Sequence, residues 1–312
     1  MNMLLVLIKR NGKLFFKDKG MFFTSMITPL ILLVLYVTFL GNVYRDSFES
    51  AVADVITVSD EVMNGLVGGQ LFSSLLAVCC VTVAFCSNML MVQDKVSGAK
   101  NDFTITPVRA SVLALGYYIA SFFSTLLICL IATAAGILYL LNVGWYLSAA
   151  DVLFILLDVC LLVMFGTVLS SIINFFLSSQ GQISAVGTII SAGYGFLCGA
   201  YMPISNFSEG LQRVLSFLPG TYGTSLIRNH TMRGVFAEMS EIGFPTEAIE
   251  GIRDSVDCNL YFYGDKVETS AMYLVLGGTV VILLGVYILM NRLSGCRGKF
   301  HIREDEVRKS DD

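Results

Sequence analysis

Charged residues are scarce in this sequence. Asp, Glu, Lys and Arg together make up 14% of its 312 residues, whereas an average soluble domain has roughly 25%. Hydrophobic residues make up 55%, and the mean hydropathy is +0.73. So much apolar surface cannot be hidden in one aqueous core. The composition therefore excludes an ordinary soluble domain and indicates an integral membrane protein.

The sequence also lacks the residues of most metal and nucleic-acid sites. The net charge is only −4, and no basic patch interleaved with aromatic residues occurs, so we expect no nucleic-acid partner. Only two histidines are present, His230 and His301, and there is no CxxC or HExxH pattern. Six of the eight cysteines lie in apolar runs, where cysteine behaves as a small hydrophobe. We therefore expect neither a metal site nor a disulfide framework.

A nucleotide-binding loop is missing as well. No GxxxxGK[ST] motif occurs, because Gly298-Lys299 lacks both the upstream glycine and the hydroxyl residue. The sequence therefore predicts no nucleotide site of this type in the chain, and we expect no cofactor in it. One alternative for the function of this chain is a membrane-embedded enzyme. Such an enzyme would need histidines or paired carboxylates within the membrane, but both histidines lie outside the apolar runs and Asp158 is the only carboxylate deep within one.

Long apolar runs are what the sequence has in abundance. A helix needs about 20 mostly apolar residues to cross the hydrocarbon core of a membrane. We therefore predict an all-α integral membrane protein whose transmembrane domain covers residues 21–291. Its six spans are expected at about 21–41, 67–92, 111–141, 152–178, 183–203 and 271–291.

The distribution of basic residues predicts the orientation. An even number of spans puts both termini on one side, and 14 of the 20 Lys and Arg residues lie on that side. The opposite segments, 42–66, 142–151 and 204–270, carry the other six but hold 15 of the 24 acidic residues. Because cytoplasmic segments are enriched in Lys and Arg, we expect a multi-pass plasma-membrane protein with both termini cytoplasmic. Residues 292–312 then form a charged cytoplasmic tail.

Residues 1–20 have the pattern of an amphipathic helix lying on the cytoplasmic face of the membrane. At helical spacing, apolar and basic residues separate onto two faces. In the alternative interpretation, the same basic residues only set the orientation. The apolar face holds Leu4, Leu7, Ile8, Leu14 and Phe15, and the basic face holds Lys9, Arg10, Lys13 and Lys17.

The predicted external segment 204–270 contains a second amphipathic pattern, between Pro203 and Pro219. It is too short to cross a membrane, so we predict a re-entrant or interfacial helical hairpin on the outer side. Residues 229–270 are acidic and form either a small ordered cap or a partly flexible loop. His230 is expected to be solvated or hydrogen-bonded rather than a metal ligand, since no partner residue has ligand spacing.

The stretch "QDKVSGAKNDFTITPVRAS", residues 93–111, is too polar to lie in lipid. Gly98 permits a sharp turn, and Pro107 disfavours helix before it. Between them Ala99–Ile105 is predicted as a short helix that exposes Phe103 as a docking residue for another protein. The alternative is an ordinary solvated loop.

This stretch resembles the first cytoplasmic loop of ABC-2 type permeases, the membrane subunits of one class of ATP-driven exporters. Gly98, Thr106, Pro107, Val108 and Arg109 match the family pattern, while Gln93-Asp94-Lys95 replaces its usual glutamate-rich start. In that family the loop is a coupling helix that binds the ATPase subunit. The resemblance therefore implies that ATPase coupling involves Asp94, Lys95, Gly98, Lys100, Asp102, Phe103, Pro107 and Arg109.

A second stretch, "GAYMPISNFSEGLQRVLSFLPGTYGTSLIR", resembles the family's Gly-x-x-x-Pro, Leu-Pro-x-x-Tyr and Leu-x-Arg patterns. The resemblance implies six spans, a separate ABC ATPase that binds Mg-ATP, and pairing with a second copy or a related permease, with membrane lipid around them. It also implies outward transport by alternating access. Apolar and small residues along the path suit an amphiphilic cargo: a drug, an antimicrobial peptide or a lipid. A non-transporting sensor or immunity subunit is the alternative.

Some residues within the spans are candidates for a functional role. Small residues recur every four positions in the fifth span, which lets another helix approach closely. The resemblance places spans two and five at the two-fold axis, although packing within the chain is an equal alternative. Asp151 and Asp158 share one face of the fourth span, and Asp158 is either a transport-related group or a hydrogen-bonded carboxylate. The interface or pathway candidates are Phe72, Val81, Phe85, Asn88, Gly187, Ser191, Gly195 and Gly199.

Overall fold

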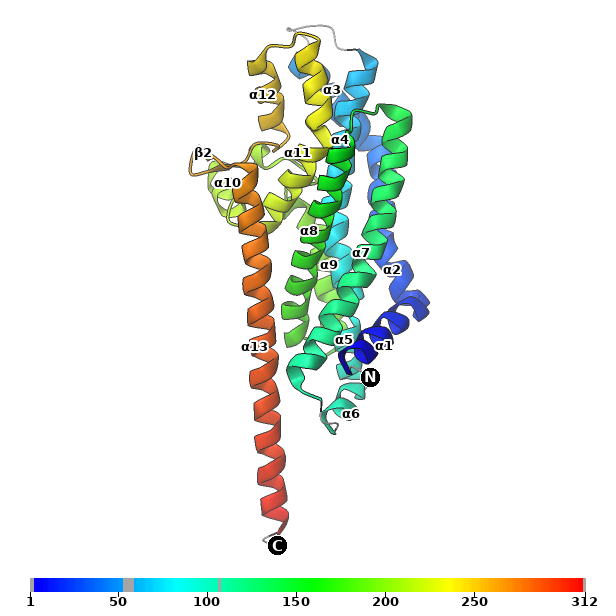
Figure 1. Ribbon diagram of the computed structural model, residues 1–312, viewed down its shortest axis with the longest axis vertical. Helices are drawn as coiled ribbons and strands as arrows, with labels where there is room; N and C mark the ends of the chain where they lie inside the picture. Colours follow the sequence, from blue (N-terminus) through cyan, green and yellow to red (C-terminus); the bar gives the residue numbers. More distant parts are fainter. Residues whose placement is uncertain (1–2, 53–58, 106–107, 311–312) are drawn as a thin grey trace.

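The computed structural model describes residues 3–52, 59–105 and 108–310, and it consists mainly of long helices running along one axis (Figure 1). The N-terminus, α6 and the last part of α13 lie toward one end of the bundle, and α12 lies toward the other, which we term the far end. The elements are α1 (Met3–Lys17), α2 (Lys19–Leu35), the π-helix η1 (Tyr36–Leu40), α3 (Gly41–Val52), α4 (Asp60–Ser87), α5 (Leu90–Val96), α6 (Ala99–Ile105), α7 (Ala110–Val143), α8 (Ala149–Phe176), α9 (Gln180–Leu197), the 3-10 helix η2 (Ile204–Asn206), α10 (Glu209–Leu215), α11 (Pro219–Glu241), α12 (Thr246–Ser255), β1 (Tyr261–Phe262), β2 (Asp265–Lys266) and α13 (Thr269–Ser310).

Five stretches of helix within the described residues are long and apolar enough to cross a membrane. They confirm an all-α membrane architecture and correspond to the first four predicted spans and the last one. Most of these helix ends lie beyond the predicted limits, because polar turns remain helical outside the apolar runs, whereas α8 stops at Phe176, before the predicted end at 178. α13 continues to Ser310 through most of the predicted tail. The five are Lys19–Ser50, Asp60–Val96, Ala110–Val143, Ala149–Phe176 and Thr269–Ser294.

The predicted fifth span corresponds to α9, whose crossing of the membrane stays a prediction. It has 18 residues and is interrupted by Gln, Ser, Thr and Gly. The expected end at residue 203 is wrong, because the helix stops at Leu197. There Gly199 adopts a φ of +73°, and the backbone N–H groups of Ala200 and Tyr201 both donate to the carbonyl of Gly195. That reversal ends the helix.

Helix α4 is the centre of the bundle and packs against α2, α7, α8, α9 and α11. Small residues on its neighbours allow the close approach. A Cβ added to Gly166 of α8 would lie 2.9 Å from the Cα of Val81, and a Cβ on Gly136 of α7 would collide with the ring of Phe72. Helices in membranes pack through such small residues because lipid supplies no hydrophobic driving force between them.

Polar residues fix where several helices begin. Ser148 and Asp151 form a reciprocal capping box at the start of α8, and Ser179 and Gln182 form another at the start of α9. Ser59 accepts a hydrogen bond from the backbone of Val62 and caps α4. Each cap satisfies N–H groups that would otherwise lack a partner at the helix end.

The segment predicted to be external, 204–270, is ordered in the described structure. α11 packs along α4, α8 and α13 at the far end of the bundle, and α12 lies beside it (Figure 1). An antiparallel two-stranded hairpin follows, pairing Tyr261 with Lys266 and Phe262 with Asp265. The expected re-entrant hairpin around α10 stays a prediction, because its depth in a membrane depends on the position of the lipid.

Candidate functional site

The polar segment between α4 and α7 folds into a turn and a short helix. Gly98 has a φ of +82°, a conformation that a residue with a Cβ rarely adopts, and it separates α5 from α6. α6 spans Ala99–Ile105, as the sequence predicts. Pro107 lies outside the described residues. In Figure 1 α6 lies beyond the start of α7, at the end of the bundle where the N-terminus lies.

An ion pair joins this segment to the N-terminal helix. Arg10 of α1 donates to both carboxylate oxygens of Asp94, at 2.5 and 3.1 Å. The hydroxyl of Tyr117 on α7 donates to the same carboxylate at 2.5 Å. The Arg10 guanidinium also lies 5.1 Å from the ring centre of Phe103. The expectation that Phe103 is exposed is therefore wrong: it is half-buried, and the Arg10 side chain of α1 lies over its ring.

Lys95 connects the same segment to the end of α8. Its ammonium group donates to the backbone carbonyls of Asn174, Phe175 and Leu177 at 2.7 to 3.0 Å. These carbonyls belong to the last turn of a helix, where partial negative charge favours a cation. A displacement of α5 must therefore move α8 or break these bonds.

The break between α4 and α5 is held by a buried polar network around Asn88. Its side-chain amide donates to Ser170 and Ser171 of α8, at 3.0 and 2.8 Å, and its side-chain oxygen accepts from Ser121 of α7 at 3.2 Å. Asn174 donates back to the Asn88 carbonyl at 3.1 Å. The network links α4, α7 and α8 at the point where the spanning helix changes into the polar segment.

The other predicted coupling residues lie on the surface of this segment. Asp102 and Arg109 are exposed, and Arg109 immediately precedes α7. Lys100 is half-buried, and its burial lowers the pKa of its ammonium group. An exposed acidic group on α6 and an exposed basic group just before α7 are thus accessible to a partner.

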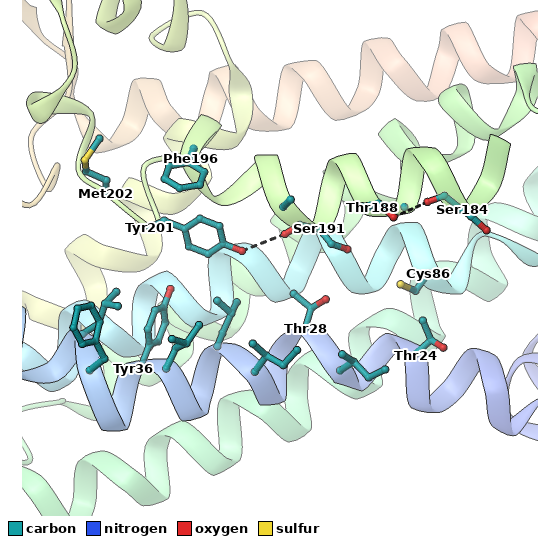
Figure 2. Close-up of a pocket in the computed structure, with 18 of the residues that line it drawn as sticks. Thr24, Thr28, Tyr36, Cys86, Ser184, Thr188, Ser191, Phe196, Tyr201 and Met202 are labelled. Carbon is teal, nitrogen blue, oxygen red and sulfur yellow. Dashed lines mark hydrogen bonds between the residues drawn. The ribbon is translucent and has the colours of Figure 1, made fainter. Parts of the chain in front are cut away.

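A groove runs along the bundle between α2 and α9, with a volume of about 1500 Å³. Figure 2 shows side chains from both helices pointing into it. Both walls mix apolar and hydroxyl side chains, among them Ile27, Thr28 and Ile31 of α2 and Ser184, Thr188 and Phe196 of α9 (Figure 2). The lower part of its floor contains Cys86, Met89 and Gln93, so the groove reaches the start of the polar segment.

Several hydroxyl groups line the groove, and two of them form hydrogen bonds with nearby backbone carbonyls instead of across the groove. Thr188 donates to the carbonyl of Ser184 at 2.9 Å, and Tyr201 donates to the carbonyl of Ser191 at 3.3 Å (Figure 2). The buried hydroxyl of Tyr36 has no partner among the described residues. The groove is therefore mostly apolar with scattered polar groups, a surface that suits amphiphilic molecules or another helix.

The predicted interface residues fall into two groups. Gly187 and Ser191 line the groove, whereas Gly195 is covered by the ring of Tyr201 and Gly199 forms the turn after α9. The residues predicted on α4 are buried among helices of the same chain instead of lining the groove. These buried residues are Phe72, Val81, Phe85 and Asn88.

Asp158 is fully buried and fully paired. One carboxylate oxygen lies 2.6 Å from Nδ1 of His230 on α11, and the other accepts a hydrogen bond from Tyr273 on α13. The ring of Phe154 stacks on His230 at 4.9 Å. Asp151 lies about two helical turns before Asp158 on α8 and forms an ion pair with Arg233 of α11, with an N–O distance of 2.7 Å. The prediction that both carboxylates share a face is confirmed, and His230 is hydrogen-bonded as expected.

A second buried charge, Arg228 of α11, joins the far-end elements. It donates to the carbonyls of Val256 and Gly199, at 2.5 and 3.0 Å, and to Ser74 of α4 at 3.2 Å. Asp257 lies 3.5 Å away, and burial raises the pKa of this carboxyl group against the opposing effect of Arg228. Arg228 therefore fixes the turn after α9 to α4 and to the end of α12.

The sequence did not reveal the partners of these groups. Arg10 and Asp94 stand 84 positions apart, and Asp158 and His230 stand 72 apart. One available signal was the density of Gly, Thr and Ser around Arg228 and His230, which is unusual for an exposed loop and typical of a closely packed helix. Within the described residues no three His, Cys, Asp or Glu side chains gather as metal ligands would.

A comparison with protein families decides the class of this arrangement. The model of the family described as ABC-2 type transporter matches residues 2–231. The chain belongs to the ABC-2 type transporter family. It is therefore a multi-pass membrane protein of a transport family, and the matched part contains the Arg10–Asp94 ion pair, α6, both helices that form the walls of the groove, and Arg228.

The rest of the chain lies outside the matched residues. Most of the far-end segment, with α12 and the hairpin, and the candidate spanning helix α13 come after the last matched residue. No curated protein and no solved structure matches the chain.

Proposed function

We propose that this chain is the membrane-spanning permease subunit of an ATP-driven exporter. A separate ABC ATPase binds and hydrolyses Mg-ATP, and the permease pairs with a second copy or a related permease. The observation that carries the proposal is the attachment of the polar segment. Asp94 is held by Arg10 and Tyr117, and Lys95 holds the end of α8, so force on α6 reaches three helices of the bundle.

The orientation follows from the charges and the positions of the ends. α1 and α6 lie toward the same end as the C-terminal part of α13 (Figure 1). The excess of Lys and Arg at that end makes it cytoplasmic by the positive-inside rule. An ATPase in the cytoplasm then meets the exposed charges Asp102 and Arg109, and the far end faces outward.

The groove between α2 and α9 is the proposed place of contact with the second permease subunit and with the cargo. Most of the α2 side chains from Ile27 to Leu35 are exposed in the single chain, and Gly187 and Ser191 line the α9 side of the groove. A path between two such surfaces is mainly apolar with hydroxyl groups. Its cargo is therefore an amphiphile such as a drug, an antimicrobial peptide or a lipid.

Transport proceeds by alternating access. ATP-driven closure of the ATPase pair displaces α6 and α1, and the Asn88 network carries the displacement to α4, α7 and α8. Gly98 and the turn at Gly199 allow the segments beside them to rotate. ATP drives this change only if it binds one conformation more tightly than the other.

The test is reconstitution of the permease with its ATPase in lipid vesicles. A fluorescent phospholipid and an amphiphilic dye serve as probes of cargo. The proposal predicts movement of at least one probe that requires ATP and stops when the ATPase carries an inactive Walker lysine. ATP hydrolysis with no movement of any amphiphile would instead favour a sensor or immunity subunit of the same fold.

A further inference from the structure

An exposed apolar patch lies on the far-end segment, where α10 meets the β-hairpin. It consists of Leu211, Val214, Phe217, Phe262 and Tyr263, whose exposed fractions run from 36% for Phe262 to 67% for Tyr263. Exposure of apolar side chains to water is unfavourable relative to an apolar environment. A contiguous patch of this kind marks a surface that contacts something other than water.

The helical part of the patch is amphipathic. Leu211 and Val214 stand three positions apart on α10, and Phe217 continues the same spacing just after the helix. The polar side of the helix carries Glu209 and Arg213, which form an exposed ion pair at 3.7 Å. Separation of apolar and charged sides is what a helix at a membrane surface requires.

The hairpin places an aromatic residue at its turn. Tyr263 and Gly264 connect β1 to β2, and both have positive φ angles, of 52° and 98°. A tight two-residue turn needs these angles, and Asn, Asp or Gly usually fills the first position. A bulky residue there is strained. The turn itself therefore gains nothing from the tyrosine ring, which points to a use for the ring beyond the turn.

The three rings form one cluster. The ring centres of Phe217 and Phe262 lie 5.1 Å apart, those of Phe262 and Tyr263 lie 5.0 Å apart, and Phe217 and Tyr263 are 6.1 Å apart. All three pairs are edge-to-face, a favourable arrangement for aromatic rings. The cluster fixes the hairpin to α10, so the patch is a single surface built from two elements.

The position of the patch along the bundle matches the edge of the membrane. Only Val267 and Glu268 separate the hairpin from α13, whose candidate membrane span begins at Thr269. Figure 1 shows β2 and α10 beside this upper end of α13. Leu274 and Val275, within the first two turns of α13, are exposed apolar residues, as expected of a helix surrounded by lipid. The patch therefore lies beside the end of the candidate span, at the level where headgroups are expected (Figure 1).

We propose that the patch inserts into the headgroup region of the leaflet on the side opposite the termini, where lipid is its partner. Aromatic side chains concentrate at this level of a membrane because their rings are apolar while their edges tolerate water. Exposed Asp265 and Lys266 on β2 remain on the aqueous side of the cluster. The contact anchors α10 and the hairpin to the bilayer surface independently of transport.

The chain allows a direct test because it contains a single tryptophan, Trp145. We would combine Trp145→Phe with Tyr263→Trp in the full chain and reconstitute it in phosphatidylcholine vesicles whose acyl chains are brominated near the headgroup. The matched control carries Glu247→Trp, at an exposed position on α12, in the same background. Insertion predicts that bromine lowers the emission of the 263 variant about twofold or more and leaves the control unchanged.

Two outcomes would overturn the proposal. Emission at 263 that is quenched by aqueous acrylamide, as in the control, and not by bromine would place the patch in water. Emission shielded from both quenchers would show that protein covers the patch, either a second copy or another partner. Neither measurement involves ATP or cargo, so the outcome is separate from that of the transport experiment.

Discussion

Arg10 of α1 and Asp94 of α5 form a bidentate ion pair across 84 positions of the chain, with N–O distances of 2.5 and 3.1 Å. The planar guanidinium matches the two oxygens of the carboxylate, a geometry that lysine cannot reproduce. The hydrogen bond with Asp94 is the main reason why the pKa of Arg10 is raised. The pair makes α1 and the polar segment one mechanical unit.

The first prediction concerns this pair. Arg10→Ala should uncouple ATP hydrolysis from transport and lower cargo-stimulated ATPase activity of the purified complex, because α6 loses its attachment to α1. Arg10→Lys should give an intermediate result, since it keeps the charge but not the second hydrogen bond. Lys13→Ala removes the same charge from an exposed position of α1 and should behave as the wild type. If the Arg10→Ala and Lys13→Ala variants lose equal amounts of cargo-stimulated ATPase activity, the effect comes from the positive charge of α1 and not from the ion pair.

The second prediction concerns the turn at Gly98. Gly98→Ala should lower the free energy of unfolding by about 1 kcal/mol, because an L-residue is strained at a φ of +82°. A Cβ at this position meets no atom within 4 Å, so the effect is conformational and not steric. Gly12→Ala in α1 also meets nothing, but it lies in regular helix and should stabilise the chain by a few tenths of a kcal/mol up to about 1 kcal/mol. Thermal unfolding in detergent measures both; a stabilised Gly98→Ala variant would contradict the strain.

The third prediction separates packing from proton chemistry at Asp158. Asp158→Ala should cost about 3 kcal/mol or more, since it leaves His230 and Tyr273 buried without their partner. Asp158→Asn keeps an acceptor for Tyr273, so we expect a much smaller loss of thermal stability and retained transport. Asp102→Ala, at an exposed position, is the control and should change stability by no more than about 0.5 kcal/mol. A stable Asp158→Asn protein without transport would show that the group must titrate.

The fourth prediction is a pH dependence at the far end. Glu250 accepts hydrogen bonds from Lys266 and Asn259, and the bond from Lys266 is the largest cause of its lowered pKa. A carboxyl pKa that is lower in the folded state contributes stability above its unfolded value of about 4.3, and this contribution disappears as the pH falls through the folded value. The wild type should therefore be more stable than Glu250→Gln at pH 7, and the difference should shrink as the pH falls below about 4.3 and vanish once the pH is below the lowered folded pKa. If the difference in stability between the wild type and Glu250→Gln persists in acid, it does not come from the negative charge of Glu250.

Local patterns in the sequence predicted the elements, and contacts between distant residues decided the site. α6 was predicted at its observed limits because Gly98 and Pro107 mark both of its ends in the sequence. The third and fourth spans, observed at Ala110–Val143 and Ala149–Phe176, follow from uninterrupted apolar runs. The end of α9 was misplaced because Gly199 reverses the chain within an apolar stretch that looks continuous.

The side-chain networks required the tertiary structure. Phe103 was expected to be exposed because nothing in residues 93–111 indicates that α1 lies over it. Asp158 was recognised as the only deep carboxylate, yet its partner His230 was placed outside the membrane, since α11 is not apolar enough to be read as part of the bundle. The sequence shows which residues are unusual for their neighbourhood, such as a carboxylate in an apolar run. It does not show which residues contact each other in the folded chain.

The most direct test of the account is whether α6 contacts an ATPase. A photo-crosslinking amino acid would replace Asp102, on the exposed face of α6, in the native host, with the same amino acid at Glu247 of α12 as the control. Coupling through α6 predicts a crosslink from position 102, but not from 247, to a protein that contains a Walker ATP-binding motif. If the chain is purified intact and position 102 reaches no such protein, residues 93–111 are a solvated loop and the coupling function proposed for them is wrong.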